Sequence, residues 1–183
     1  MKFVLVRHCE TDWNREGRLQ GHSDIGLNEK GWLEAEELAK KLKSLAIAGI
    51  VSSDLKRSQE TSFLLARYLG LEVKLDARLR ECNFGSLEGK NREEVLKLYL
   101  PRRIDIDGLW HGSFIEYDFE SFGGEPRDRV LRRHLSLLDE LYIEGGKEPL
   151  LLVGHGTGLG TLLTYLKRPP LHRGEHVVIE YPD

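Results

Sequence analysis

Residues 2–14 read KFVLVRHCETDWN, and the first five of them, KFVLV, form an almost entirely apolar run. Short apolar runs of this kind are typical of strands buried inside a sheet. The run stops at Arg7 and His8, and Cys9 follows. Both His8 and Cys9 can act as nucleophiles, so the end of this predicted strand is a candidate reactive position.

Strand-like segments alternate with helical periodicities along the rest of the chain. The predicted helix at about 31–45 has its apolar side chains on one face, and Gly70 follows the next helix where a C-cap glycine is expected. This alternation predicts an α/β fold, a three-layer sandwich with a largely parallel central sheet and helices on both faces. Strands are expected at 2–6, 48–53, 72–76, 149–155 and 176–181, and further helices at about 55–69, 130–142 and 157–166.

Polar residues follow four of these predicted strands. In open α/β sheets, ligands bind beyond the carboxyl ends of the strands. A single histidine or arginine is usually a core or surface residue, but four strand ends that all supply reactive side chains predict one shared crevice. The residues concerned are Arg7, His8, Ser52, Ser53, Arg57, Arg80, Glu81 and His155.

This set of side chains suits the chemistry of a phosphoryl group. Arginine donates a planar fork of N–H groups to phosphate oxygens and stays charged at physiological pH. A neutral histidine can accept the phosphoryl group, and a carboxylic acid can give the leaving oxygen its proton. Fixed guanidinium charges can do what a metal ion does elsewhere, so we expect neither a metal nor a cofactor.

Length and composition limit the possible classes of protein. The 183 residues, 40% hydrophobic and 31% charged, fit one domain over 1–183, and no apolar run approaches the roughly 20 residues of a membrane span. The N-terminal apolar run is too short for a signal-peptide core and the chain has only two cysteines, so we expect a soluble protein in a reducing cytoplasm. A net charge of −3 and a pI near 6.2 argue against nucleic-acid binding by bulk electrostatics. The sequence carries no signal for an oligomeric state.

Five segments, in order, resemble the motifs of one family. The segment at 5–14, LVRHCETDWN, resembles the Arg-His-Gly-x-Thr-x-x-Asn signature of the histidine phosphatase superfamily, also called the phosphoglycerate-mutase-like family. Short members similar to this chain include α-ribazole phosphatases and broad-specificity phosphatases. The other four matches are GRLQGHSDIGLNEKG (17–31), VSSDLKRSQET (51–61), RECNFGSLEG (80–89) and LLVGHG (151–156).

The resemblance implies a metal-independent phosphomonoester hydrolase that acts on a small phosphorylated substrate through a phosphohistidine. His8 would accept the phosphoryl group, and Arg7, Arg57 and His155 would hold it. Glu81 would donate a proton to the leaving group. The family's further contacts with the phosphate or its substituent fall on Asn14, Gln20, Gly21 and the backbone of Gly156.

Cys9 supports a rival hypothesis. It stands where the resembled family usually has Gly or Ala, and His8, Cys9 and Arg15 have the His-Cys-x5-Arg spacing of the cysteine-dependent tyrosine phosphatases. Against this hypothesis, Glu10 and Asp12 would put two carboxylates in the phosphate loop, which also lacks a glycine. It would also leave the polar residues of the other strand ends without a role.

Within the resembled family, two features favour a phosphatase over a phosphoglycerate mutase. The lid-like insertion at about 91–125 is short for a metabolic mutase, and Phe84 lacks the hydroxyl of the tyrosine that mutases usually carry there. Mutase-type phosphoryl transfer is the alternative. Five aromatic residues of the insertion either pack it onto the domain or face the leaving group: Trp110, Phe114, Tyr117, Phe119 and Phe122.

A hypothesis from another class is a non-catalytic module that binds phosphorylated ligands. Loss of catalysis would most simply appear as loss of His8 or Glu81. Both residues are present in their motifs, so we expect an enzyme.

Overall fold

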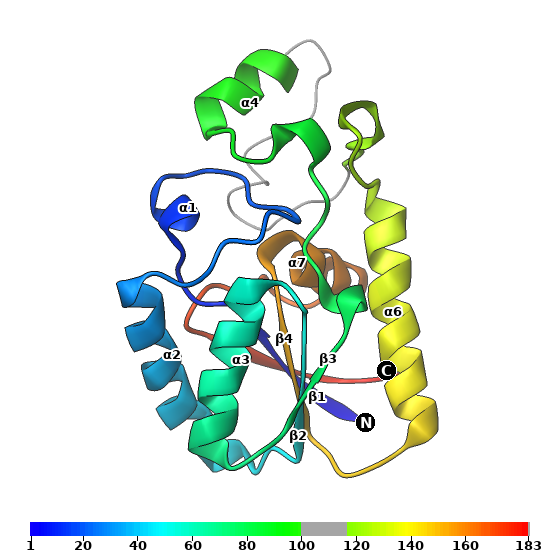
Figure 1. Cartoon of the computed structure of the whole chain (residues 1–183). Helices are drawn as coiled ribbons and strands as arrows, with labels where there is room; N and C mark the ends of the chain where they lie inside the picture. The colour runs from blue at the N-terminus through cyan, green and yellow to red at the C-terminus, as the bar shows by residue number, and fades with distance from the viewer. Residues whose placement is uncertain (100–116, 183) are drawn as a thin grey trace.

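A five-stranded sheet organises the structure, a computed structural model that describes residues 1–99 and 117–182 (Figure 1). The strand order is β3-β2-β4-β1-β5. All neighbouring pairs are parallel except β1 and β5, which are antiparallel, so the predicted largely parallel sheet is confirmed. The strands are β1 (Lys2–Arg7), β2 (Gly49–Ser52), β3 (Val73–Leu75), β4 (Leu150–Gly154) and β5 (His176–Glu180).

The register between β1 and β4 brings two chain segments together that are far apart in sequence. Val6 pairs with Val153 and Arg7 pairs with Gly154. The residues that follow these two strands therefore leave the sheet side by side at its carboxyl edge. This is how His8 and His155 become neighbours.

Helices cover both faces of the sheet, as the alternating sequence pattern predicts (Figure 1). Along β1, Val4 and Val6 pack toward α2 and α3, whereas Phe3 and Leu5 pack toward α6 and α7, because successive strand side chains point to opposite faces. The main helices are α2 (Glu29–Leu42), α3 (Lys56–Leu69), α6 (Arg127–Glu144) and α7 (Gly156–Tyr165), and the short ones are α1 (Asp12–Arg15) and α4 (Arg92–Tyr99).

Local signals explain where helices start and stop. The Asn28 side chain accepts the Gly31 N–H at 2.8 Å, so α2 begins at Glu29, two residues before the predicted start. Helix α3 ends at Gly70, whose φ of 68° is the left-handed conformation expected of a C-cap glycine. No helix within the described ranges has both the length and the apolar character needed to cross a bilayer.

A third apolar cluster joins residues 117–122 to the rest of the described chain. Tyr117 and Phe119 are buried in it, and the Phe119 ring meets Phe84 edge-on at 5.1 Å between centroids. These two aromatic residues therefore pack the segment onto the fold, which was one of the two roles expected of them. The predictions for Trp110 and Phe114 lie outside the described residues.

Candidate active site

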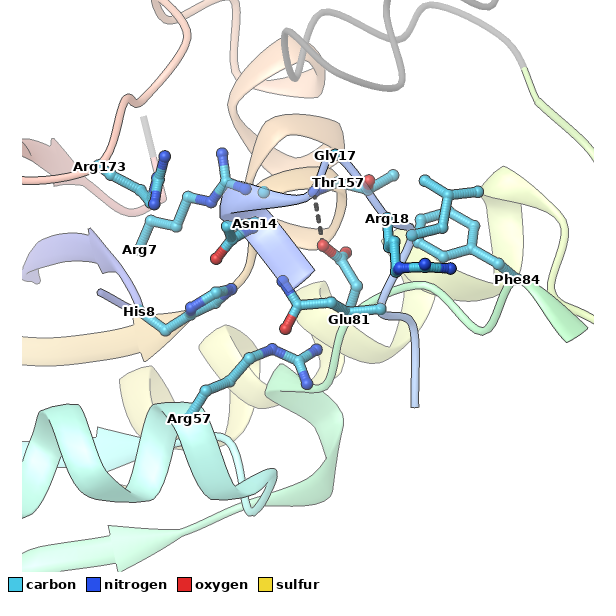
Figure 2. A pocket seen from close by; sticks show the side chains of 13 residues that line it. Arg7, His8, Asn14, Gly17, Arg18, Arg57, Glu81, Phe84, Thr157 and Arg173 are labelled. Atoms are coloured by element: carbon cyan, nitrogen blue, oxygen red, sulfur yellow. Dashed lines mark hydrogen bonds between the residues drawn. The ribbon is translucent and has the colours of Figure 1, made fainter. Parts of the chain in front are cut away.

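A pocket of about 140 Å³ opens at the carboxyl edge of the sheet (Figure 2). It is smaller than typical pockets for drug-sized ligands, so it suits a small group. Four arginines line it, although the whole chain has a net charge of −3. The lining residues are Arg7, His8, Asn14, Gly17, Arg18, Leu19, Gln20, Arg57, Glu81, Phe84, Gly156, Thr157 and Arg173.

The ring of His8 is fixed in one orientation with one nitrogen free. Its Nδ1 lies 2.7 Å from the carbonyl oxygen of Cys9, so Nδ1 carries the proton and donates it. Nε2 therefore keeps its lone pair. Burial, with the charges of Arg57 and Arg7, holds the pKa of His8 well below its usual value. The ring is neutral at physiological pH, as a nucleophile must be.

Cys9, the rival nucleophile, is fully buried and does not line the pocket. Its backbone N–H donates to the Thr61 hydroxyl at 3.1 Å, and its side chain packs in the apolar cluster between the sheet and α2 and α3. Burial raises the pKa of the thiol to about 12, so it stays protonated. This geometry speaks against cysteine chemistry and agrees with a small filler behind His8.

Arg57, near the start of α3, is completely buried and two of its nitrogens are held by backbone carbonyls. One Nη donates to Ser23 O at 2.9 Å and the other to Gly21 O at 2.7 Å. Nε has no partner among the described residues. Burial lowers the pKa of Arg57 to about 10, which still leaves a cation at neutral pH. The side chain thus offers a fixed positive charge and an Nε–H without a partner in the described residues.

Arg7, the last residue of β1, also has a buried Nε without a partner in the described part of the chain. Its guanidinium packs against Gly156, where a Cβ would come within 2.9 Å of Arg7 Cζ. A side chain at the first position of α7 would therefore displace the Arg7 guanidinium. Two orphaned N–H groups, on Arg7 and Arg57, thus belong to side chains that line the pocket beside His8 (Figure 2).

His155 does not line the pocket and lies next to His8. Its ring centroid is 5.1 Å from that of His8, and its Nε2 lies 2.8 Å from Ser53 Oγ and 3.2 Å from Ser58 Oγ. Nδ1 is buried with no partner among the described residues. Burial and the charge of Arg57 hold the pKa of His155 well below its usual value.

Glu81 reaches the pocket from the segment after β3 and is anchored on the start of α7. Its Oε1 accepts the N–H groups of Cys82 and Gly158, both at 2.8 Å, and its Oε2 accepts the Thr157 N–H at 3.1 Å. Arg133 of α6 holds the backbone of the same segment by donating to Glu81 O at 2.8 Å. The carboxyl group is thereby fixed across the pocket from His8 (Figure 2).

Of the other predicted binding residues, Asn14, Gln20 and Gly156 line the pocket and Gly21 does not. The Asn14 Oδ1 faces the Thr11 N–H at 3.2 Å, which leaves the Asn14 amino group for a ligand. Gly21 has a φ of 50° and acts through its carbonyl, which accepts from Arg57. A Cβ there would overlap the Glu88 carboxylate.

Four of the eight residues expected in the crevice do not line the pocket, namely Ser52, Ser53, Arg80 and His155, and other residues that line it were not predicted. Arg80 forms a two-pronged ion pair with Asp54, at 2.6 and 2.7 Å, and does not line the pocket. Arg18 is part of the quoted segment 17–31, and Thr157 directly follows the quoted segment 151–156, so the motifs pointed to both positions. Arg173 lies outside every quoted motif.

Comparison with known sequences identifies a family. Residues 3–182 match the family described as the histidine phosphatase superfamily (branch 1). A probable phosphoglycerate mutase GpmB of Escherichia fergusonii is 37% identical over 165 residues, which cover 90% of this chain and 74% of the relative. The corresponding protein of Cronobacter sakazakii is 37% identical over 174 residues, with 94% and 77% coverage.

Solved structures with the same fold cover almost the whole chain. A mycobacterial glucosyl-3-phosphoglycerate phosphatase in complex with VO3 has a TM-score of 0.84 at 29% identity, covering 98% of this chain and 92% of that one. Bacillus stearothermophilus YhfR has a TM-score of 0.82 at 29% identity, with 98% and 90% coverage. These likenesses confirm the fold that the sequence predicts.

Proposed function

The chain belongs to the histidine phosphatase superfamily, and on this premise we propose that it hydrolyses phosphomonoesters through a phosphohistidine on His8. The observation that carries the proposal is the free Nε2 of His8 in a pocket shared with two buried guanidinium groups. Arg7 and Arg57 each have an Nε–H without a partner among the described residues. Oxygens of a phosphoryl group would satisfy both, so the proposal accounts for two buried donors that otherwise cost free energy.

In the first step, His8 Nε2 attacks phosphorus while the bond from phosphorus to the ester oxygen breaks. Glu81, in its protonated form, gives its proton to the departing oxygen, and an alcohol leaves. In the second step, water attacks the phosphohistidine and Glu81 takes up the water proton. Inorganic phosphate leaves, and His8 and Glu81 return to their starting forms.

The positive charge in this scheme comes from arginine side chains. Arg7, Arg57 and the Nδ1 side of His155 would spread stabilisation over the oxygens of the transferring group. We therefore propose that turnover needs no divalent metal. The test is hydrolysis of p-nitrophenyl phosphate in excess EDTA, which should proceed at the untreated rate. Activity abolished by EDTA and restored by a divalent cation would contradict the proposal.

Phosphoglycerate mutation is the second candidate, because GpmB relatives carry that name. A mutase must return the phosphoryl group to the product before water reaches the phosphohistidine. Phe84 lines the pocket where a mutase usually has a tyrosine hydroxyl. An assay with 3-phosphoglycerate and its bisphosphate primer separates the candidates, because a phosphatase releases inorganic phosphate and a mutase yields 2-phosphoglycerate.

We also propose that residues 1–183 form one domain with a lid-like insertion at about 91–125, and that the protein works in the cytoplasm on a small phosphorylated molecule. The family match from residue 3 to 182 and the single sheet support one domain. Limited proteolysis tests the single domain, because one domain should leave one resistant fragment or complex that contains all five strands.

A further inference from the structure

Arg173 is a charged residue of the pocket to which the motifs assign no role. It lies in the segment between α7 and β5, and it lines the pocket together with Arg7 and His8. Figure 2 shows its side chain beside Arg7, on the opposite side of the pocket from Arg18 and Phe84. Its charge also contributes to the low pKa of both His8 and Arg7, which agrees with this proximity.

A hydrogen bond to Glu10 holds Arg173 in place, and Arg173 can break it without leaving Glu10 unpaired. Its Nη1 donates to Glu10 Oε2 at 3.1 Å. Glu10 is nearly buried and also accepts from Lys30 Nζ at 2.8 Å and from Asn28 Nδ2 at 3.2 Å. If Arg173 turned toward a ligand, the Glu10 carboxylate would still accept hydrogen bonds from Lys30 and Asn28. Moving Arg173 therefore leaves no unpaired buried carboxylate.

Most of the hydrogen-bonding capacity of Arg173 is unused. A guanidinium has five N–H donors, and the contact with Glu10 is its single hydrogen bond within the described residues. The side chain is 29% exposed, so it has room to move. Arg7 beside it carries a like charge, and an anion placed between the two would relieve their repulsion.

We propose that Arg173 is a third arginine ligand of the transferring phosphoryl group, stored on Glu10 until the substrate binds. The assignment to the phosphoryl group, not to the leaving group, follows from position, because Arg173 lies on the Arg7 and His8 side of the pocket. Arg18 lies beside Phe84 on the Glu81 side of the pocket, and Glu81 is the proposed proton donor to the leaving group (Figure 2). The inference rests on the proposed function, since it names a ligand of the same site.

The test compares Arg173→Gln and Arg173→Lys with Arg168→Gln, a matched change at an exposed arginine of the same segment. Binding of vanadate and of inorganic phosphate is measured by calorimetry without turnover. Arg173→Gln should weaken both by about tenfold, because it removes one charge-assisted contact. The affinity of Arg173→Lys for both anions should lie between those of Arg173→Gln and the unmodified protein, because lysine keeps the charge but not the planar fork of N–H donors. Arg168→Gln should bind as the unmodified protein does.

Kinetics with two substrates locates the contact. Because the phosphoryl group is common to all substrates, Arg173→Gln should lower kcat/KM by a similar factor for p-nitrophenyl phosphate and for 3-phosphoglycerate. A loss confined to 3-phosphoglycerate would move Arg173 to the leaving group and overturn the assignment. Unchanged vanadate and phosphate affinity in folded Arg173→Gln would overturn it too. The calorimetric measurement of anion binding does not depend on turnover. A protein that binds phosphate through Arg173 but hydrolyses no phosphomonoester would therefore contradict the phosphatase proposal and not the role of Arg173.

Discussion

The guanidinium of Arg7 lies against Gly156, so close that a Cβ on this glycine would be 2.9 Å from Cζ and 3.2 Å from both Nη atoms of Arg7. Alanine suits the helix at this position, so Gly156→Ala should push Arg7 aside without unfolding the protein. We expect kcat/KM for p-nitrophenyl phosphate to fall about tenfold or more, because a guanidinium displaced by 1 Å no longer fits the phosphoryl oxygens. Steady-state kinetics and a thermal melt measure the two effects.

Gly49→Ala is the matched control for this change. Its added Cβ would meet the flexible end of the Leu150 side chain at 3.2 Å, away from the pocket. It should leave kcat/KM within about twofold of the unmodified value, as expected of a substitution that touches no pocket residue. Full activity in Gly156→Ala would show that Arg7 does not need its observed position.

His134 in α6 makes stability sensitive to acid. It is fully buried, its Nδ1 donates to Val130 O at 2.8 Å, and its Nε2 has no partner among the described residues. Burial lowers its pKa to about 3. The unfolded chain binds the proton near pH 6.5, so between these values it holds more protons than the folded chain, and stability falls as pH decreases. At pH 5 the loss from this residue should be about 2 kcal/mol.

Urea unfolding of His134→Gln at pH 7 and pH 5 measures this contribution. The difference in unfolding free energy between the two pH values should shrink by about 2 kcal/mol relative to the unmodified protein. Exposed His172 provides the control, and His172→Gln should keep the full difference. An equal acid loss in both variants would mean that His134 titrates normally in the folded protein.

The loss of rate on substituting Glu81 should increase with the need of the leaving group for a proton. Glu81→Gln cannot supply that proton, so hydrolysis of an alkyl phosphate should slow by about 10²-fold or more. p-Nitrophenolate leaves with little protonation, so p-nitrophenyl phosphate should be affected far less. Comparing kcat/KM, which reports the step that releases the leaving group and not the hydrolysis of the phosphohistidine, for both substrates in one preparation corrects for any general disturbance of the start of α7. Equal losses would remove Glu81 from the acid role.

The alternation of apolar strands and amphipathic helices was enough to predict the sheet, because each strand buried on both faces reads as a continuous apolar run. Strand and helix ends were predicted to within a few residues. The early start of α2 was missed since it depends on the side chain of Asn28 accepting a backbone N–H, a contact that periodicity does not contain. The antiparallel pairing of β5 with β1 was not predicted, because an apolar run does not indicate the direction of the strand.

Motif position predicted which side chains reach the pocket but not how they are held. Arg57 was expected as a phosphate ligand, yet its support by the carbonyls of Gly21 and Ser23 comes from a loop 34 or more residues away in sequence. Arg80 was expected in the crevice from its position after a strand, but its ion pair with Asp54 holds it elsewhere. Arg173 had no signal, because its place depends on how the segment before β5 returns to Glu10.

The choice between His8 and Cys9 as nucleophile can be made by substitution and by the stability of the trapped intermediate. His8→Ala should abolish turnover and the trapped phosphoenzyme, because no other histidine and no cysteine lines the pocket in the described structure. Cys9→Ser should keep most activity, since the thiol is buried and its pKa of about 12 keeps it protonated. Serine in this apolar site can cost stability, so a thermal melt accompanies each assay. The label on the unmodified protein should be lost in acid and kept in base, as a phosphohistidine is. A folded, inactive Cys9→Ser beside an active His8→Ala would reverse the assignment in favour of cysteine.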